Sequence, residues 1–309
     1  MGLVVNQYIK NLVGRYNKEV GIPYYSFSDF KGLKQEAKTF TNSRGVEIHY
    51  FFYYYDNFIK DMVVLFCPGI GPGHTSYLRE IELLAKHGYK VLTLDYTGCG
   101  ESKGEILGSL NMATFDAIEL LNLMNFKEEV VVVGHSLGGY TSLNLVHLRD
   151  EIKKAVIMSG FVSIKSLMLE LLHSKFITNR ILKYEQKTVP EYFGLNNEEY
   201  LKTTKDKLFV IQSEDDTLVP YKVALKVAED ANNPSIKTLK VTGRKHNPNY
   251  TDAAIKYMSE TFGTYYKLIK NKTIKTDEDK INYFKNISIE KLTEQDTEMF
   301  EEIFKFIDE

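Results

Sequence analysis

Residues 129–148 read EVVVVGHSLGGYTSLNLVHL, a stretch in which three patterns follow one another. The run of valines at 130–133 predicts a strand that is buried on both faces. GHSLG, at 134–138, has the pattern G-x-S-x-G, and the residues after it have helical spacing. In a sharp strand-to-helix turn a serine hydroxyl is lifted clear of the sheet, and small neighbours prevent clashes. The stretch therefore predicts a nucleophile at Ser136, with a plain strand–helix turn as the alternative.

Strand and helix patterns alternate along most of the chain. A hairpin is predicted over residues 38–55, where a Ser-Arg-Gly turn separates two runs rich in β-branched and aromatic residues. Further strands are predicted at 62–67, 90–95, 154–158, 207–212 and 236–241, and helices at 77–87, 114–124 and 252–268. Strands that alternate with helices of this length favour βαβ units. We therefore expect an α/β fold, with a mostly parallel central sheet and helices on both faces.

The 309 residues exceed what one such domain needs, and the surplus falls in three places. Residues 161–204 separate two predicted strands and begin with an apolar helical pattern, and an insertion of this size is usually functional. We predict a body of residues 38–160 and 205–268, with 161–204 as a cap or lid. Residues 1–37 form an N-terminal lead segment. Residues 269–309 form a C-terminal helical extension, which we expect to pack against the body, with a docking element as the alternative.

Composition excludes several classes of protein. With 43% hydrophobic and 26% charged residues the chain can bury a sizeable core, which excludes wholesale disorder. The net charge of −2 argues against nucleic acid or an anionic membrane as the main partner. Two cysteines, Cys67 and Cys99, cannot build a disulfide scaffold. The sequence shows no signal-peptide pattern and no apolar run long enough to span a membrane, so we expect a cytoplasmic protein.

A serine hydroxyl is a weak nucleophile at neutral pH and needs a base that a carboxylate orients. SEDDTLVP, at 213–220, follows one predicted strand, and GRKHN, at 243–247, follows the next. Both segments lie at the carboxyl ends of strands, where open α/β sheets carry their sites. His246 is the candidate base. For the acid, the residues alone leave Glu214, Asp215 and Asp216 open.

With these motifs, residues 38–268 resemble the α/β-hydrolase fold serine hydrolases, in the esterase, lipase and aminopeptidase-like group. The family's D-x-x-V-P pattern matches DTLVP, so the resemblance implies Asp216 as the acid and His246 as the base. CPGIG, at 67–71, matches the first oxyanion loop, although Pro68 stands where His is usual. The resemblance implies an oxyanion hole made by the backbone N–H groups of Ile70 and Leu137, and it implies no metal or organic cofactor.

The resemblance implies a serine hydrolase that acts through an acyl-enzyme, and the apolar cap favours a small-molecule ester with a hydrophobic acyl or alkyl part. Candidate substrate contacts are His74, Met168, Leu172 and Phe176. The cap stripe could equally pack onto the body, and His74 could cap the helix that follows it. A thioesterase, an acyltransferase or a non-catalytic ligand-binding member of the fold remain alternatives. So does a peptidase or amidase, which would need a carboxylate such as Glu170 or Glu185 to anchor a substrate amine.

Three smaller expectations concern residues near this site. We expect His135, inside the G-x-S-x-G segment, to pack beneath the nucleophile rather than to take part in the chemistry. LDYTGCGESKG, at 94–104, resembles the family's D-x-x-G-x-G-x-S-x-G loop and is expected beside the site. Cys67 and Cys99 are expected in loops near the pocket, where alkylation of their thiols would report on it.

Overall fold

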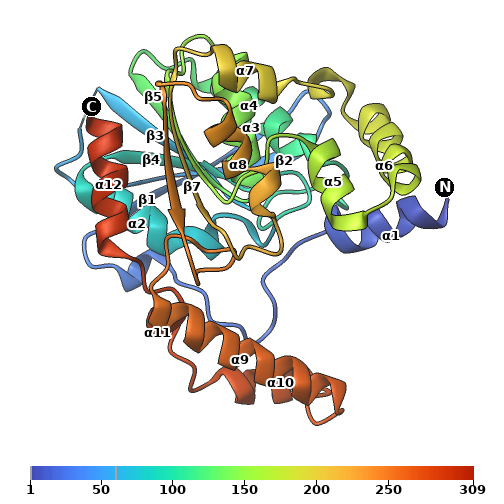
Figure 1. Cartoon of the computed structure of the whole chain (residues 1–309). Helices are drawn as coiled ribbons and strands as arrows, with labels where there is room; N and C mark the ends of the chain where they lie inside the picture. Colours follow the sequence, from blue (N-terminus) through green and yellow to red (C-terminus); the bar gives the residue numbers. More distant parts are fainter. Residues whose placement is uncertain (1, 60) are drawn as a thin grey trace.

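The computed structural model describes residues 2–59 and 61–309 (Figure 1). Its strands are β1 (Lys34–Thr41), β2 (Glu47–Tyr54), β3 (Met62–Cys67), β4 (Lys90–Leu94), β5 (Glu129–His135), β6 (Lys154–Met158), β7 (Lys207–Ser213) and β8 (Ile236–Val241). Its α-helices are α1 (Leu3–Leu12), α2 (Leu78–His87), α3 (Asn111–Met124), α4 (Leu137–Leu148), α5 (Ile164–Leu172), α6 (Lys175–Thr188), α7 (Asn197–Thr203), α8 (Leu225–Asp230), α9 (Asp252–Lys270), α10 (Asp277–Phe284), α11 (Ile289–Leu292) and α12 (Thr297–Asp308).

The strands form one eight-stranded sheet in the order β1-β2-β4-β3-β5-β6-β7-β8. Pairs β1–β2 and β2–β4 are antiparallel, and every pair from β4 to β8 is parallel. The predicted α/β fold with a mostly parallel sheet is confirmed. Because β5 lies between β3 and β6, the residues that follow it emerge at the middle of the sheet edge, which is where α/β folds place their sites.

The core is divided between the two faces of the sheet. Val131 and Val132 are neighbours on β5, yet they belong to different buried clusters because successive strand residues point to opposite faces. On one face, Val132 packs with residues of α3 and α4, such as Leu120 and Leu143. On the other face, the cluster that includes Val131 contains residues of α2 and α12.

The helix that covers the sheet after the last strand is α12, which differs from the predicted body boundary at residue 268. Phe300, Ile303, Phe304 and Ile307 are buried at the i, i+3, i+4, i+7 spacing of a helix with one apolar face. Helix α9 forms close to where a helix was predicted, but Figure 1 shows α9, α10 and α11 projecting from the body. We call residues 252–292, which contain these three helices, the arm.

The arm has a small core of its own. Tyr265 on α9 packs with Ile274 and Phe284, and the rings of Tyr265 and Phe284 lie 4.8 Å apart. The buried Tyr265 of α9 is therefore packed within the arm rather than against the sheet.

The cap, residues 161–204, contains α5, α6 and α7. Its middle section contains α6, a helix of 14 residues that the Ser174 side chain caps. Helix α1 of the lead segment packs against the cap. The Tyr8 hydroxyl of α1 donates a hydrogen bond of 2.5 Å to Glu185 of α6, and the Ser109 hydroxyl of the body donates one of 2.6 Å to the same carboxyl.

The chain between α1 and the sheet is also attached to the body. The Arg15 guanidinium donates hydrogen bonds to the backbone carbonyls of Gly100, Ser102 and Gly104, at 2.7–3.0 Å. The lead segment thus contacts the glycine-rich loop that lies beside the expected site. Of the helices in residues 2–59 and 61–309, none is long and apolar enough to cross a membrane.

Candidate active site

Ser136 lies in a strained turn between β5 and α4. Its φ of 59° and ψ of −119° are rarely adopted by residues with a side chain, and such strain is common at functional sites. Glycines at 134 and 138 permit the turn, because a Cβ on Gly134 would overlap the carbonyl of Gly138. Ser136 is partly exposed, while the residues on either side of it are buried. The sequence pattern G-x-S-x-G therefore has a steric basis in this chain.

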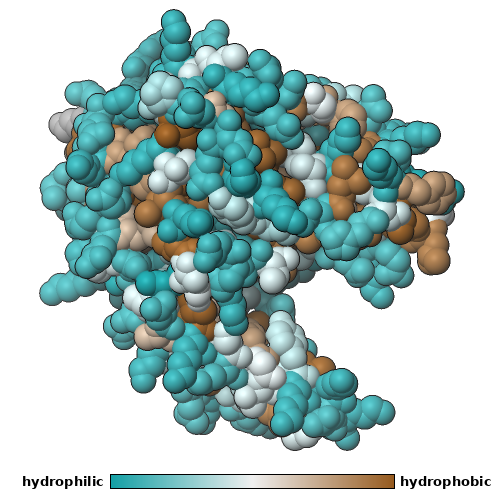
Figure 2. All heavy atoms as spheres, in the orientation of Figure 1, coloured by the Kyte–Doolittle hydropathy of each residue, from teal (hydrophilic) through white to brown (hydrophobic). Residues whose placement is uncertain are grey.

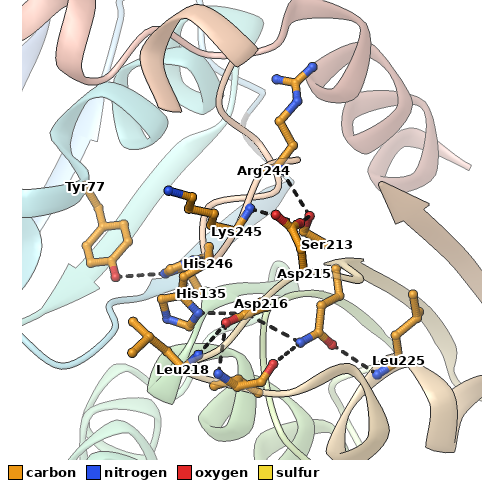
Figure 3. A network of polar contacts seen from close by, with 12 residues as sticks. Tyr77, His135, Ser213, Asp215, Asp216, Leu218, Leu225, Arg244, Lys245 and His246 are labelled. Atoms are coloured by element: carbon orange, nitrogen blue, oxygen red, sulfur yellow. Dashed lines mark hydrogen bonds and ion pairs between the residues drawn. The ribbon is translucent and has the colours of Figure 1, made fainter. Parts of the chain in front are cut away.

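His246 and Asp216 lie on the loops that follow β8 and β7, and Figure 3 shows them facing one another. The distance from His246 Nδ1 to Asp216 Oδ2 is 2.8 Å. The Asp216 carboxylate is buried, and its Oδ1 accepts hydrogen bonds from the backbone N–H groups of Leu218 and Val219 at 2.9 and 3.0 Å. The imidazole is 17% exposed. Because the carboxylate accepts a hydrogen bond at Nδ1, the neutral imidazole carries its proton there and leaves Nε2 free to accept one.

The neighbouring acids have other contacts. Asp215 Oδ1 accepts hydrogen bonds from the backbone N–H groups of Gly243 and Lys245 at 3.0 and 3.3 Å, which joins the acid loop to the histidine loop. Partial burial alone would raise the pKa of Asp215, but the bonds from Ser213 and from these N–H groups hold it below its usual value. Glu214 accepts a hydrogen bond from the Thr242 hydroxyl. Of the three acids that the sequence left open, the structure brings Asp216 into contact with His246.

His135 connects the serine turn to the histidine loop. Its Nε2 lies 2.7 Å from the backbone carbonyl of His246, and its ring centre lies 4.8 Å from that of His246. A carbonyl only accepts, so Nε2 carries the proton and Nδ1 accepts from the Tyr77 hydroxyl at 3.0 Å. Burial, with the nearby charge of His246, lowers the pKa of His135 to about 3, so the ring stays neutral. Sequence reasoning missed Tyr77, which carried no signal beyond its place in a predicted helix.

The CPGIG loop lies against the serine turn. A Cβ on Gly69 would come within 3.2 Å of the Ser136 Cβ, and one on Gly138 would overlap the carbonyl of Cys67. Within the described part of the chain, the N–H groups of Ile70 and Leu137 have no hydrogen-bond acceptor. Their role as oxyanion donors stays a prediction.

His74 and Asp95 form a buried pair behind this loop. Asp95 Oδ1 accepts hydrogen bonds from the backbone N–H of His74 at 2.7 Å and from its Nδ1 at 2.8 Å. The other oxygen of Asp95 accepts from the backbone N–H of Glu101 at 2.8 Å. The His74 ring also packs on Phe51, with ring centres 3.8 Å apart. In this arrangement His74 joins the CPGIG loop to the glycine-rich loop, and its contact with a substrate stays a prediction.

The candidate contacts on the cap divide into buried and exposed side chains. Met168 is 2% exposed and belongs to the core, whereas Leu172 is 39% and Phe176 66% exposed. Their contact with a substrate also stays a prediction. Cys67 and Cys99 are both buried, and burial raises the pKa of Cys67 to about 12. Alkylation of these thiols would therefore not report on an open pocket, contrary to our expectation from sequence.

The cap and the body enclose a cavity of about 530 Å³. Tyr140, one turn after Ser136 on α4, lines it together with Ile164 and Leu182 of the cap. Among the described residues, no group of three or more His, Cys, Asp or Glu side chains could hold a metal ion.

Two curated hydrolases match part of the sequence at 30% identity. One is 2-hydroxy-6-oxo-6-(2'-aminophenyl)hexa-2,4-dienoic acid hydrolase of Metapseudomonas resinovorans, matched over 40% of this chain and 42% of that protein. The other is 2-hydroxy-6-oxononadienedioate/2-hydroxy-6-oxononatrienedioate hydrolase of Escherichia coli, matched over 32% of this chain and 36% of that protein. The chain thus matches less than half the length of either relative.

Solved structures of esterases share the fold. The Pyrococcus furiosus esterase Pf2001 superposes with a TM-score of 0.57 at 20% identity, over 84% of this chain and 96% of the esterase. Est1E of Butyrivibrio proteoclasticus, solved with ferulic acid bound, has a TM-score of 0.57 at 18% identity, over 74% of this chain and 98% of Est1E. At such identities the likeness shows the fold alone.

The serine aminopeptidase S33 family matches residues 59–233, which is more than half of the chain and includes Ser136 and Asp216. The resemblance predicted from the motifs is thereby confirmed. This chain belongs to the serine aminopeptidase S33 family, and it is a serine hydrolase of the α/β-hydrolase fold.

Proposed function

We propose that this protein cleaves a carboxylic ester with a hydrophobic acyl or alkyl part, with Ser136 as nucleophile, His246 as base and Asp216 as the orienting acid. The observation that carries the proposal is the 2.8 Å contact between His246 Nδ1 and the buried Asp216 carboxylate. The contact lies at the same sheet edge as the strained turn of Ser136. His135, the residue before Ser136, donates a hydrogen bond to the backbone carbonyl of His246 and so connects the serine turn to the histidine loop.

In the proposed reaction, the Ser136 hydroxyl attacks the ester carbonyl carbon while His246 Nε2 takes its proton. Asp216 stabilises the imidazolium that forms, and the N–H groups of Ile70 and Leu137 bind the oxyanion. A donor of this kind contributes about 3–4 kcal/mol to the stability of the transition state. The imidazolium then protonates the leaving alcohol. A water molecule, deprotonated by His246, attacks the acyl-enzyme and releases the acid.

The contacts of the base support this role. The Ser136 hydroxyl has no hydrogen bond to a described residue. In unliganded enzymes such bonds are often long, and they tighten when substrate binds. Two contacts position His246. Asp216 accepts a hydrogen bond from Nδ1 of its imidazole, and His135 donates one to its backbone carbonyl.

The two carboxylates that could have anchored a substrate amine have other roles, which favours an ester over a peptide. Glu185 is buried and accepts hydrogen bonds from Tyr8 and Ser109. Glu170 lies 3.5 Å from the ammonium group of Lys222. A charged substrate amine would have to displace these partners, whereas an uncharged ester needs neither carboxylate.

A fluorophosphonate probe, which reacts with activated serines, tests the nucleophile. We expect it to label the wild type and not Ser136→Ala, and labelling that persists in Ser136→Ala would refute the assignment. Hydrolysis of nitrophenyl acyl esters should exceed that of aminoacyl anilides in a comparison of kcat/KM. Faster hydrolysis of the anilides would make the protein a peptidase instead.

A further inference from the structure

A second cavity, of about 300 Å³, lies where the arm meets the body. Figure 2 shows the molecular surface hollowed beside the arm. Three parts of the chain contribute walls: the lead segment, the start of α2 and the arm. The apolar and aromatic residues that line it include Tyr24, Tyr25, Leu78, Met258, Phe262 and Leu292. We call this cavity the arm pocket.

Hydrogen bonds link two residues that line the arm pocket to the segments that follow the CPGIG loop and the predicted base. Thr75 and Ser76 line it, and the Thr75 hydroxyl donates a hydrogen bond to the carbonyl of Pro72, the residue after the CPGIG loop. Tyr250 lines it on the other side, and its N–H donates to the carbonyl of Asn247, the residue after His246. A chain attached to a carbonyl at Ser136 would therefore find this pocket next to both segments.

The lining of the arm pocket suits an uncharged chain. Arg79 is one of its two charged lining residues, and its guanidinium pairs with the Glu82 carboxylate at 2.8 Å, which balances its charge. The other, Glu19, is exposed. The remaining walls are mainly aliphatic and aromatic, and the volume lies at the lower end of about 300–1,000 Å³ for small-molecule sites. These features fit a hydrocarbon chain of moderate length.

Hydrogen bonds hold the arm against the histidine loop, so that the pocket has a fixed outer wall. Glu80 of α2 accepts hydrogen bonds from the side-chain amides of Asn249 and Gln295 at 3.2 and 3.1 Å. The Thr251 hydroxyl donates to Glu294 at 2.7 Å. These contacts join the two segments that flank the arm to each other and to α2.

We propose that the arm pocket binds the unbranched hydrocarbon acyl chain of the ester, so that the arm sets the preference for chain length. This inference rests on the proposed ester hydrolysis. It places substrate selection in the C-terminal part of the chain, outside residues 161–204.

The test compares kcat/KM for nitrophenyl acetate and nitrophenyl octanoate in four proteins. Met258→Trp fills the pocket, and Phe262→Ala enlarges it. Gly263→Trp is the matched control, because a Cβ at Gly263 meets nothing within 4 Å and the residue is outside the pocket lining. We expect Met258→Trp to lower the octanoate-to-acetate ratio about 10-fold or more. Phe262→Ala should move the optimum to longer chains, and Gly263→Trp should keep the wild-type ratio.

A second measurement reports binding without turnover. The chain contains no tryptophan, so Phe262→Trp and Gly263→Trp each carry a single tryptophan whose emission can be followed. An octyl phosphonofluoridate bound to Ser136 should shift the emission of Phe262→Trp to shorter wavelength, because the chain displaces water from the indole. The methyl reagent should not, and Gly263→Trp should respond to neither.

The failures of the two proposals are distinguishable. Wild-type ratios in both Met258→Trp and Phe262→Ala, together with an unshifted emission in Phe262→Trp, would overturn the arm pocket while Ser136-dependent hydrolysis still supports the proposed function. If the folded wild type hydrolyses no ester in a Ser136-dependent way and Ser136 does not react with the octyl reagent, both proposals are overturned.

Discussion

The cap and the arm are both helical additions to the sheet, but their apolar side chains have different surroundings. In the cap, Met168 is packed into the core and Phe176 faces solvent. In the arm, Met258 and Phe262 are half-buried and line a cavity. An apolar stripe at helical spacing therefore indicates a helix with an apolar face, and the neighbouring elements decide whether that face is covered, exposed or left as a pocket.

Each region is attached to the body through a buried carboxyl. Glu185 joins the cap to α1 and to Ser109, and it accepts two hydroxyl hydrogen bonds and one from the backbone N–H of Leu110. Glu80 of α2 accepts two amide hydrogen bonds at one oxygen from the segments that flank the arm, while its other oxygen has no partner among the described residues. Burial raises the pKa of both carboxyls. The arm's attachment is thus the less completely hydrogen-bonded of the two.

The largest expected effect concerns the site that both regions flank. Asp216→Asn should lower kcat for nitrophenyl acetate by about 10⁴-fold, because the imidazole loses its orienting carboxylate and adopts the wrong tautomer. Asp215→Asn is the matched variant, and we expect a loss of less than about 10-fold, since Asp215 contacts backbone N–H groups rather than the imidazole. The opposite ranking would move the acid role to Asp215.

The attachment of the arm should make stability depend on pH. Burial raises the pKa of Glu80 to about 7 from 4.5, so the folded protein binds this proton more tightly than the unfolded chain. The contribution of Glu80 to the free energy of unfolding should therefore fall by about 3 kcal/mol as pH rises from about 4.5 to about 7. Glu80→Gln should remove that fall in denaturant titrations at pH 5 and pH 8. Glu278→Gln, at an exposed position on α10, is the control, and equal pH dependence in all three proteins would contradict the assignment.

The attachment of the cap should respond to the loss of one donor. Tyr8→Phe removes the hydroxyl that donates to Glu185 and leaves a buried carboxyl short of a partner. We expect a loss of about 1–3 kcal/mol in the free energy of unfolding. Tyr266→Phe, in a ring that is 60% exposed, should change it by less than about 0.5 kcal/mol. Equal losses in the two variants would show that the Tyr8 hydroxyl does not hold α1 to the cap.

The smallest expected effect is an absence of reaction at the thiols. Cys67 and Cys99 are buried, so iodoacetamide should modify neither in the folded protein and both in denaturant. Mass spectrometry of the intact protein measures the outcome. Rapid modification of Cys67 under native conditions would contradict this expectation and would mean that the oxyanion loop opens.

The sequence predicted the elements of the body closely because their signals are local. Strands Met62–Cys67, Lys154–Met158 and Ile236–Val241 have the bounds expected from their apolar runs. The first strand begins at Lys34, four residues before the predicted hairpin, because polar edge residues carry no apolar signal. For the candidate site, the G-x-S-x-G turn and the two loops after β7 and β8 were visible in sequence. Tyr77 was not visible, because its role depends on a histidine 58 residues away.

The sequence by itself determined the fold class, the candidate nucleophile and base, and the order in which the motifs occur, because each depends on a few adjacent residues. The residues alone left three adjacent acids open, and the family resemblance implied Asp216. The contact between Asp216 and His246 itself is seen only in the tertiary structure, because it depends on how two loops pack. The tertiary structure also decided that α12, and not residues 252–268, covers the sheet, and that the arm encloses a pocket. Such outcomes depend on contacts between residues far apart in the chain, and the periodicity of a segment does not indicate which distant residues it contacts.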